Sequence, residues 1–271
     1  MPLTQEQIEQ FKRDGYTTAP DFFDRREVQA MQAEVARWFA EDMLHNVATD
    51  GDGKTQSTKA ANLQMIPLYP KSPLFKALPF QPKVIDAVSS LIGDPMILHL
   101  DQSFYKPAHK GAGTNWHQDN GYFKISDPQR GTALWIAVHD ATEINGTIRV
   151  IPGVFNEAYE HTRDPQSNHH VRCYPPEERE VSCVLPAGGV VFFCYGVPHA
   201  TGPNHTDKDR AGVAFHFLHA SNAKDDLIAE GRDCRPYLTG PKATQGEKEY
   251  GQRVEPTAWD AEVDKLVGAT A

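Results

Sequence analysis

The chain has 271 residues, 27 of them Lys or Arg and 36 Asp or Glu, which gives a formal net charge of -9. It contains no run of Lys and Arg, so neither nucleic acid nor an anionic membrane surface is expected as a partner. The N-terminus lacks a basic segment followed by an apolar one, and no apolar stretch reaches the ~20 residues of a membrane helix. The four cysteines have no metal-binding spacing, which is typical of free thiols in a reducing compartment. We therefore expect a cytoplasmic protein.

The N-terminal part, about residues 1–95, carries the signals of helices. Thr4 can cap a helix over 4–14, and Asp24 with Glu27 forms a capping-box pattern before a longer amphipathic helix. A further helix is expected over 82–92, where Gly93 would end it. The polar, glycine-containing segment 50–59 is expected to be a loop.

From Met96 onward the sequence changes to short runs with the composition of β-strands. We expect strands near 96–105, 113–118, 132–140, 147–151, 180–184, 189–195 and 211–219. No helix-length segments alternate with them, so a parallel α/β sheet is not expected. Helices followed by many short strands predict a mainly β fold with flanking helices and a double-stranded β-helix (jelly-roll) core over about 96–220. The whole chain, 1–271, would then form a single domain.

Two segments do not fit this pattern. Residues 156–178 have no clear period, and we expect an insert between strands that is either a solvated loop or a lid. As a lid it would close over an anionic substrate. The charged and imidazole side chains that it would bring there are Arg163, His169, His170 and Arg172. After about residue 231 the sequence is polar and spaced by Pro and Gly, which predicts an extended C-terminal tail over 231–271.

His117, Asp119 and His199 form the strongest candidate metal site. Side chains at i and i+2 of a strand share a face, so His117 and Asp119 would point inward and Gln118 outward. His199 would arrive from a distant strand through the turn that contains Pro198. Two imidazoles and one carboxylate suit Fe(II) and leave coordination positions open.

The other histidines have competing interpretations. His216 and His219 lie three residues apart on the last expected strand and would face opposite sides, so one of them could line the cavity. Six others are assigned to solvent or to the insert: His45, His109, His161, His169, His170 and His205.

Arg210 follows His199 by eleven residues and is the candidate anchor for a co-substrate. Its planar guanidinium matches a carboxylate through two parallel hydrogen bonds, as the far carboxylate of a 2-oxo acid would require. Thr201 could add a hydroxyl to the same group. The alternative for Arg210 is a surface ion pair with Asp207 or Asp209.

These residues lie in three stretches that resemble the phytanoyl-CoA dioxygenase family of Fe(II)/2-oxoglutarate-dependent oxygenases. The stretches are 115–123 with His117-Gln118-Asp119, 131–153 with Trp135 and Asn145-Gly146-Thr147-Ile148-Arg149-Val150-Ile151-Pro152-Gly153, and 197–218 with His199-Ala200-Thr201-Gly202 and Arg210. The resemblance covers about residues 5–220. One departure is that Val154 and Phe155 follow the Pro-Gly turn, where the family usually has Ser or Thr and then His. We expect that position near the substrate entrance.

The resemblance implies roles for the residues that match. His117, Asp119 and His199 would bind Fe(II), and Arg210 and Thr201 would hold the far carboxylate of 2-oxoglutarate. Trp135 would line that pocket, and Gln102 would touch the head of the co-substrate. These seven residues are our candidate site.

The implied reaction is hydroxylation of an unactivated C–H bond of a small-molecule metabolite, with O2 consumed and succinate and CO2 as co-products. A carboxylate at Asp119 fills a position that a halogenating relative would leave to chloride, which favours hydroxylation. Two alternatives remain open: a cupin-type metal enzyme that does not use 2-oxoglutarate, and a non-catalytic metal-binding sensor domain. The substrate, its relation to CoA esters, and the choice between monomer and homodimer are not determined by the sequence. Further candidates for substrate contact are Asn62, Gln64, Asn120, Tyr122 and Phe123.

Overall fold

The computed structural model describes residues 2–223 and 235–269, in which two antiparallel sheets dominate. The larger sheet has seven strands in the order β1-β11-β6-β13-β4-β3-β2, and the smaller has four in the order β10-β7-β12-β5. The large sheet comprises β1 (Tyr16–Ala19), β2 (His45–Asn46), β3 (Leu63–Met65), β4 (Met96–Lys106), β6 (Gly131–Ala137), β11 (Val190–Cys194) and β13 (Arg210–His219). The small sheet comprises β5 (Thr114–His117), β7 (Ile148–Val150), β10 (Val181–Ser182) and β12 (His199–Thr201). The prediction of a mainly β fold with flanking helices is therefore confirmed.

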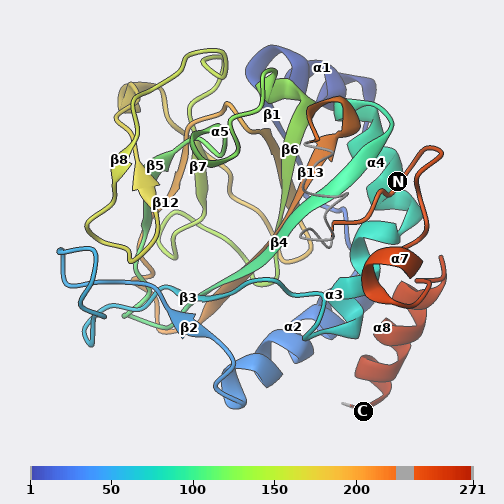
Figure 1. Ribbon diagram of the computed structural model, residues 1–271. Coiled ribbons are helices and arrows are strands. Elements are labelled where there is room, and N and C mark those ends of the chain that lie inside the picture. The colour runs from blue at the N-terminus through green and yellow to red at the C-terminus, as the bar shows by residue number, and fades with distance from the viewer. Residues whose placement is uncertain (1, 224–234, 270–271) are drawn as a thin grey trace.

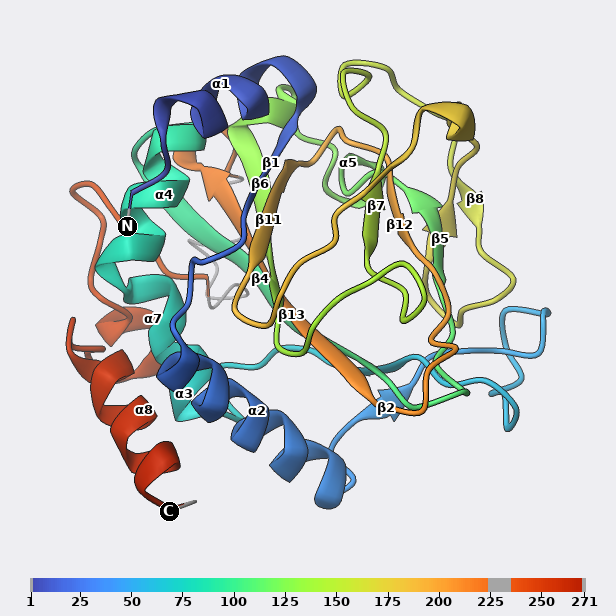
Figure 2. The same ribbon diagram turned by 180° about the vertical axis from the view of Figure 1, so that it is seen from behind.

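The helices gather on the side of the large sheet that faces away from the small sheet, as the two opposite views in Figures 1 and 2 show. Their apolar faces join the buried core formed by the large sheet. A short helix, α5, follows β5 beside the small sheet. The described helices are α1 (Gln5–Asp14), α2 (Arg25–Ala40), α3 (Pro73–Ala77), α4 (Pro82–Ile92), α5 (Asn120–Phe123), α7 (Glu247–Tyr250) and α8 (Ala258–Ala269).

Three helix predictions are confirmed, and their ends are explained by local chemistry. The Thr4 side chain accepts a hydrogen bond from the backbone N–H of Gln7 at the start of α1. Asp24 accepts from the N–H groups of Arg26 and Glu27 at 2.8 and 2.9 Å, which satisfies two donors that the helix itself leaves free. Gly93 ends α4 with a positive φ of 79°, a conformation that costs glycine little.

The N-terminal part is not wholly helical, which corrects the expectation for residues 1–95. β1, β2 and β3 come from this part and form edges of the large sheet, where Tyr16 pairs with Phe193 of β11. These strands have only two to four residues, too few for an alternating pattern to be recognised. The same reason applies to β12, which the sequence indicated only as a turn.

The C-terminal tail was predicted to be extended, and this is wrong for residues 258–269, which form α8. Trp259 is 1% exposed, and its indole N–H donates to Glu27 of α2 at 2.7 Å. Lys83 lies 2.6 Å from the other carboxylate oxygen of Glu27. In α8, polar residues are interspersed among a few apolar ones such as Trp259, so the helical period of apolar residues was weak in the sequence. Residues 231–234 of the expected tail, with Cys234, lie outside the described residues.

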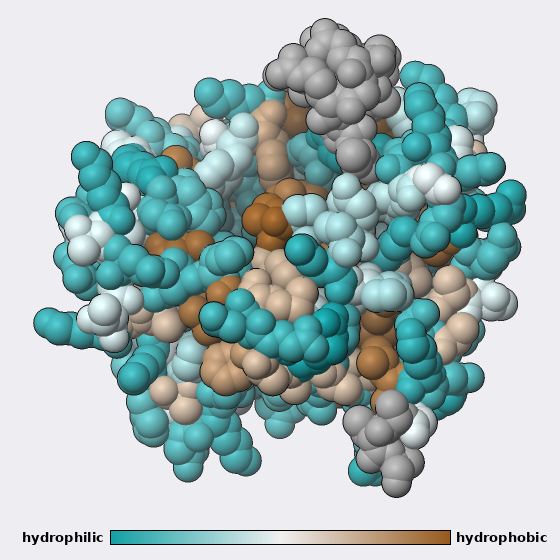
Figure 3. Space-filling view, turned by 60° about the horizontal axis from the view of Figure 1, so that its bottom comes forward, coloured by the Kyte–Doolittle hydropathy of each residue, from teal (hydrophilic) through white to brown (hydrophobic). Residues whose placement is uncertain are grey.

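None of the described helices combines the length and apolar composition needed to cross a bilayer. The face drawn in Figure 3 is mostly hydrophilic at its edges, and hydrophobic residues are visible between polar side chains in its middle.

Replacing Trp259 tests whether α8 belongs to the stable fold. Trp259→Ala should lower the free energy of unfolding by about 3–5 kcal/mol, because it removes a buried ring and a partner of Glu27. Trp259→Phe keeps most of the packing and should cost about 1–2 kcal/mol for the lost indole donor. Urea unfolding followed by circular dichroism measures both. Unchanged stability in the Ala variant would contradict the docking of α8 on α2.

Candidate metal centre and co-substrate pocket

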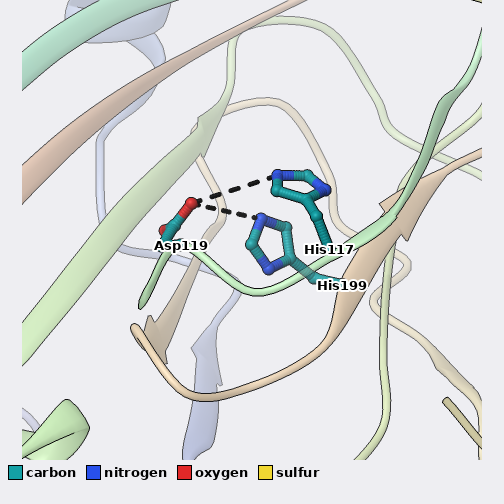
Figure 4. A group of neighbouring side chains, drawn as sticks. All are labelled: His117, Asp119 and His199. Atoms are coloured by element: carbon teal, nitrogen blue, oxygen red, sulfur yellow. Dashed lines mark ion pairs between the residues drawn. The ribbon is translucent and has the colours of Figure 1, made fainter. Parts of the chain in front are cut away.

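His117 and His199 lie opposite each other on neighbouring strands of the small sheet. They are direct partners in the register of β5 with β12, and their ring centroids are 4.2 Å apart. One oxygen of Asp119, Oδ1, lies 4.0 Å from Nε2 of His117 and 3.7 Å from Nε2 of His199. Figure 4 shows the three side chains turned toward a common point. One donor atom from each lies within 4.8 Å of the others, so the set can hold a single metal ion.

The chain reaches this arrangement differently from the expected strand alternation. β5 ends at His117, and Asp119 has helical angles, φ -57° and ψ -32°, as the residue before α5. A turn rather than the i, i+2 geometry of a strand therefore brings its carboxylate to the two imidazoles. Gln118 does not point outward: it is buried, and its amide donates to the carbonyls of Glu157 and Gly196 at 2.7 and 2.6 Å.

Backbone carbonyls orient both imidazoles. Nδ1 of His117 lies 2.8 Å from the carbonyl of Asn115, and Nδ1 of His199 lies 3.0 Å from that of Val197. A carbonyl only accepts, so each Nδ1 carries the ring proton and each Nε2 keeps its lone pair for a metal. Burial lowers the pKa of His117 to about 3, which keeps this ring neutral at physiological pH.

His216 lies beside the other oxygen of Asp119. Its Nε2 lies 3.2 Å from Oδ2, the oxygen turned away from His117 and His199. Burial alone would raise the pKa of Asp119, but the neighbouring imidazoles, His216 first, bring it below its ordinary value. His219 lies on the opposite side, with Nε2 2.9 Å from the carbonyl of Asp94. The two histidines thus face opposite sides as predicted, and His216 lies beside the metal set.

All seven candidate site residues line one cavity of about 230 Å³. The metal set lies at the small sheet, while Gln102 of β4 and Trp135 of β6 project from the large sheet. Thr201 of β12 and Arg210 of β13 complete the end of the cavity away from the entrance side chains Ile66 and Tyr122. The pocket therefore joins candidate residues that are up to 108 positions apart in the chain, from Gln102 to Arg210.

Arg210 is 1% exposed, and no carboxylate of the described residues pairs with it. It donates to the carbonyl of Gly146, and its guanidinium lies 5.5 Å from the ring of Trp135. Its Nη1 is buried without a hydrogen-bond partner in the described chain. The alternative ion pair is not formed with Asp209, whose carboxylate accepts from Tyr105 and from the N–H of Ala108. Burial lowers the pKa of Arg210 to about 9, so it stays charged at neutral pH.

Lys106 is a pocket residue that the sequence reasoning missed. It is 1% exposed and stands directly opposite Arg210 in the pairing of β4 with β13. Its Nζ donates to the hydroxyl of Thr201 at 2.7 Å and to the carbonyl of Gly202. Burial and then the charge of Arg210 lower the pKa of Lys106 well below its ordinary value. The signal in the sequence was its spacing: Gln102, Phe104 and Lys106 share one face of a strand.

The insert also contributes more than expected. His170, assigned to solvent or to the insert by default, is 8% exposed and lines the cavity together with His169. Arg163 and Arg172 do not line it: Arg163 is exposed, and Arg172 lies over the ring of Tyr174. The insert contains a two-stranded ribbon of β8 (Thr162–Arg163) and β9 (Val171–Arg172).

The position where the sequence departs from the family pattern is not at the entrance. Val154 and Phe155 are 2% and 7% exposed, belong to the packed interior and do not line the cavity. Phe155 packs so close to Gly15 that a β-carbon added to Gly15 would lie 2.7 Å from the Phe155 ring. The expectation that this position lies near the substrate entrance is therefore wrong.

Two imidazoles and one carboxylate beside a pocket with buried cations define the class of non-haem Fe(II) oxygenases. The family model of phytanoyl-CoA dioxygenase (PhyH) matches residues 11–212, so the chain belongs to this family. Family membership and the His-Asp-His set identify it as a dioxygenase that uses Fe(II), 2-oxoglutarate and O2.

The similarity to named relatives and solved structures is low in sequence identity but extends over most of the chain. The chain is 25% identical over 243 residues to ectoine dioxygenase of Stutzerimonas stutzeri, a match covering 82% of this chain and 79% of the relative. It is 27% identical over 240 residues to phytanoyl-CoA dioxygenase of Arabidopsis thaliana, covering 85% and 80%. Among solved structures, EctD from S. alaskensis with 2-oxoglutarate and 5-hydroxyectoine has a TM-score of 0.65 at 23% identity, covering 82% and 78%. The non-haem carbocyclase SnoK has a TM-score of 0.68 at 18% identity, covering 89% and 92%. These likenesses show a shared fold.

Replacing Asp119 tests whether it binds the metal directly or only belongs to the surrounding pocket. Asp119→Ala should weaken Fe(II) binding more than the about 10–100-fold expected for His216→Phe, which removes only an outer partner of the carboxylate. Titration with Co(II), followed by its visible absorbance, measures both affinities. Asp101→Asn is the control, because this buried acid of β4 lies outside the set. Undiminished metal affinity in Asp119→Ala would contradict the assignment.

Proposed function

We propose that this dioxygenase hydroxylates an unactivated C–H bond of a small-molecule metabolite, consuming 2-oxoglutarate and O2 and releasing succinate and CO2. The observation that supports this proposal is a single cavity with a metal-binding set on one side and two buried cations at one end. The facing sheets are interpreted as the two halves of a double-stranded β-helix within one domain. The buried free thiols of Cys173, Cys183 and Cys194 are compatible with the cytoplasm as its compartment.

His117, Asp119 and His199 would hold the iron, which supplies the activation of O2 when it is bound. The residues themselves contribute orientation: the carbonyls of Asn115 and Val197 fix the tautomers, and His216 fixes the far oxygen of Asp119. Because that carboxylate would take up one coordination position of the iron, that position would not be available to a halide. This supports hydroxylation over halogenation.

The far carboxylate of 2-oxoglutarate would bind between Arg210, Lys106 and Thr201. The Thr201 oxygen already accepts from Nζ of Lys106 at 2.7 Å and from the N–H of Thr114 at 3.1 Å. A hydroxyl has two lone pairs and one hydrogen, so the hydrogen of Thr201 is left to donate to an incoming anion. Nη1 of Arg210 is the second free donor. An incoming carboxylate would favour the protonated form of Lys106, which then adds a second positive charge.

Trp135 and Gln102 would position the same co-substrate. The Trp135 ring lies against the guanidinium of Arg210 and limits its rotation. Gln102 lines the cavity on β4, opposite Ala214 in the register. We assign it to the head of 2-oxoglutarate, where an amide can donate to one oxygen.

Arg210→Ala should weaken 2-oxoglutarate binding by about 100-fold or more, since a buried charged pair would be lost. Anaerobic titration of the Fe(II)-loaded protein with 2-oxoglutarate, monitored by the visible charge-transfer band of the chelate, gives the dissociation constant. If Fe(II) binds to the wild-type protein but 2-oxoglutarate produces no band, the 2-oxo acid function is contradicted.

Lys106→Met should weaken 2-oxoglutarate about 10–100-fold, because it removes a charge-assisted donor while filling the same volume. The preference for 2-oxoglutarate over 2-oxovalerate, which lacks the far carboxylate, should shrink by the same factor. Lys110→Met is the matched control, as Lys110 is exposed and outside the cavity. An unchanged preference in Lys106→Met would show that this lysine does not contact the co-substrate.

A further inference from the structure

Hydrogen bonds hold the insert 156–178 beside the metal side of the cavity. Asp164 is 2% exposed and accepts two hydrogen bonds from the side-chain amide of Asn115, at 2.9 and 3.0 Å. The N–H of Val171 donates to the hydroxyl of Tyr122 at 2.9 Å. On its other edge, Thr49 donates through its hydroxyl to the carbonyl of Pro165 at 2.6 Å. The insert is therefore an ordered wall of the cavity rather than a solvated loop.

This wall brings one imidazole close to the metal set. The ring of His170 is nearly parallel to that of His117, with 6° between the planes and 6.5 Å between the centroids. His170 lines the cavity, and burial lowers its pKa well below the ordinary value. It therefore presents a neutral ring to the cavity. A small molecule with a few carbon–carbon bonds is long enough to reach from this ring to the metal ligand His117.

A polar relay decides which nitrogen of His170 carries the proton. The amide nitrogen of Gln64 donates to the side-chain oxygen of Asn62 at 3.2 Å and lies 3.3 Å from Nε2 of His170. The amide nitrogen of Asn62 in turn donates to the hydroxyl of Thr114 at 3.2 Å. An amide nitrogen only donates, so Nε2 of His170 accepts and Nδ1 holds the hydrogen. Within the described residues Nδ1–H has no protein partner.

The rim of the cavity beside this donor combines apolar surface with the exposed imidazole of His169. Ile66 and Tyr122 line the cavity and are 53% and 39% exposed, so they form its rim. The lysine and arginine side chains that line the described cavity are Lys106 and Arg210, which lie at the end assigned to 2-oxoglutarate. Arg163 acts on His170 electrostatically, but it is exposed, does not line the cavity, and donates to the carbonyl of Asn168. An anionic substrate would therefore find no cation in the cavity lining at this end, and a cationic one would meet Asp119, which the metal requires.

From this geometry we infer that His170 is a substrate-binding residue, which donates its Nδ1–H to a carbonyl or hydroxyl oxygen of an uncharged, mainly apolar substrate. The inference rests on the proposed function and deepens it by naming the substrate class. The apolar body would lie between Ile66 and Tyr122, and the oxygen at His170 would place a C–H bond beside the metal. Gln64 and Asn62 act as positioning residues that fix the tautomer.

Four probes of similar size test the class without knowledge of the natural substrate: cyclohexanone, methylcyclohexane, cyclohexanecarboxylate and cyclohexylamine. Their dissociation constants are measured by anaerobic titration of the Fe(II) and 2-oxoglutarate complex, through the shift of the charge-transfer band, and checked by calorimetry on Zn(II)-substituted protein. Cyclohexanone should bind at least about tenfold more tightly than the other three, because it alone is neutral and accepts a hydrogen bond. Preference for the anion or the cation, or equal binding of cyclohexanone and methylcyclohexane, would overturn the inference.

Variants of His170 identify the donor. His170→Phe keeps a ring of similar shape and should weaken cyclohexanone about tenfold, while His170→Asn, which retains an amide donor near the position of Nδ1, should recover part of the loss. His205→Phe, the same change at an exposed histidine outside the cavity, is the matched control. Equal cyclohexanone affinity in wild type and His170→Phe would overturn the role of His170. The band formed with 2-oxoglutarate alone should persist in every variant, and its absence from the wild type would contradict the proposed function instead.

Discussion

The register of β13 between β4 and β6 is the constraint on which the pocket depends. It sets Arg210 opposite Lys106, and it sets Ala214 between Gln102 and Trp135. Gly212 makes this register possible, since a β-carbon there would lie 2.4 Å from the indole ring of Trp135. A shift of one residue would turn every side chain of β13 to the other face and remove the guanidinium from the cavity. The pairing is long, from Arg210↔Lys106 to His219↔Met96, and this length makes slippage costly.

The two buried cations link the stability of the apoprotein to its co-substrate. Lys106 and Arg210 lie in an acidic protein, yet the described structure places no carboxylate between them. Removing two like charges from water is unfavourable, and the lowered pKa of Lys106 expresses that cost. A dicarboxylate that occupies the cavity restores the missing counter-charge, so ligand binding and folding are coupled in the same direction. The pocket is thus organised for a ligand that the polypeptide alone does not replace.

The sequence predicted the parts of this site that depend on unusual residue combinations. His117, Asp119, His199 and Arg210 were recognised because their types and order are informative without knowledge of the fold. The path of the chain was less predictable: Asp119 reaches the imidazoles through a turn, and Gln118 is buried, because the strand ends at His117, two residues before the Asp119 that alternation required. The helices with clear caps were predicted correctly. Short edge strands and α8 were not, since their patterns depend on tertiary partners such as Glu27.

Lys106 and His170 show a different limit. A lysine in an amphipathic strand and a histidine in a polar insert both have ordinary surface interpretations, and only three-dimensional pairing overturns them. For Lys106 the decisive contact is its strand partner 104 positions later, Arg210, and for His170 it is Gln64, 106 positions earlier. Local periodicity does not reveal which residue so far away in the sequence will be the partner. Such residues become visible only when their burial is known.

The insert is tied to the residues that flank the metal ligands, and this joins substrate recognition to the metal centre. Asp164 holds Asn115, whose carbonyl orients His117, while His161 accepts from the N–H of Gln118 at 3.0 Å. A change at Asp164 therefore reaches His117 through two hydrogen bonds, and a change at His161 reaches Asp119 through the bond to its neighbour Gln118. His170 has no such bond to a ligand, because its partner is Gln64 of β3. The wall of the cavity can accordingly vary at His170 to fit another substrate while Asp164 and His161 keep the metal ligands in place.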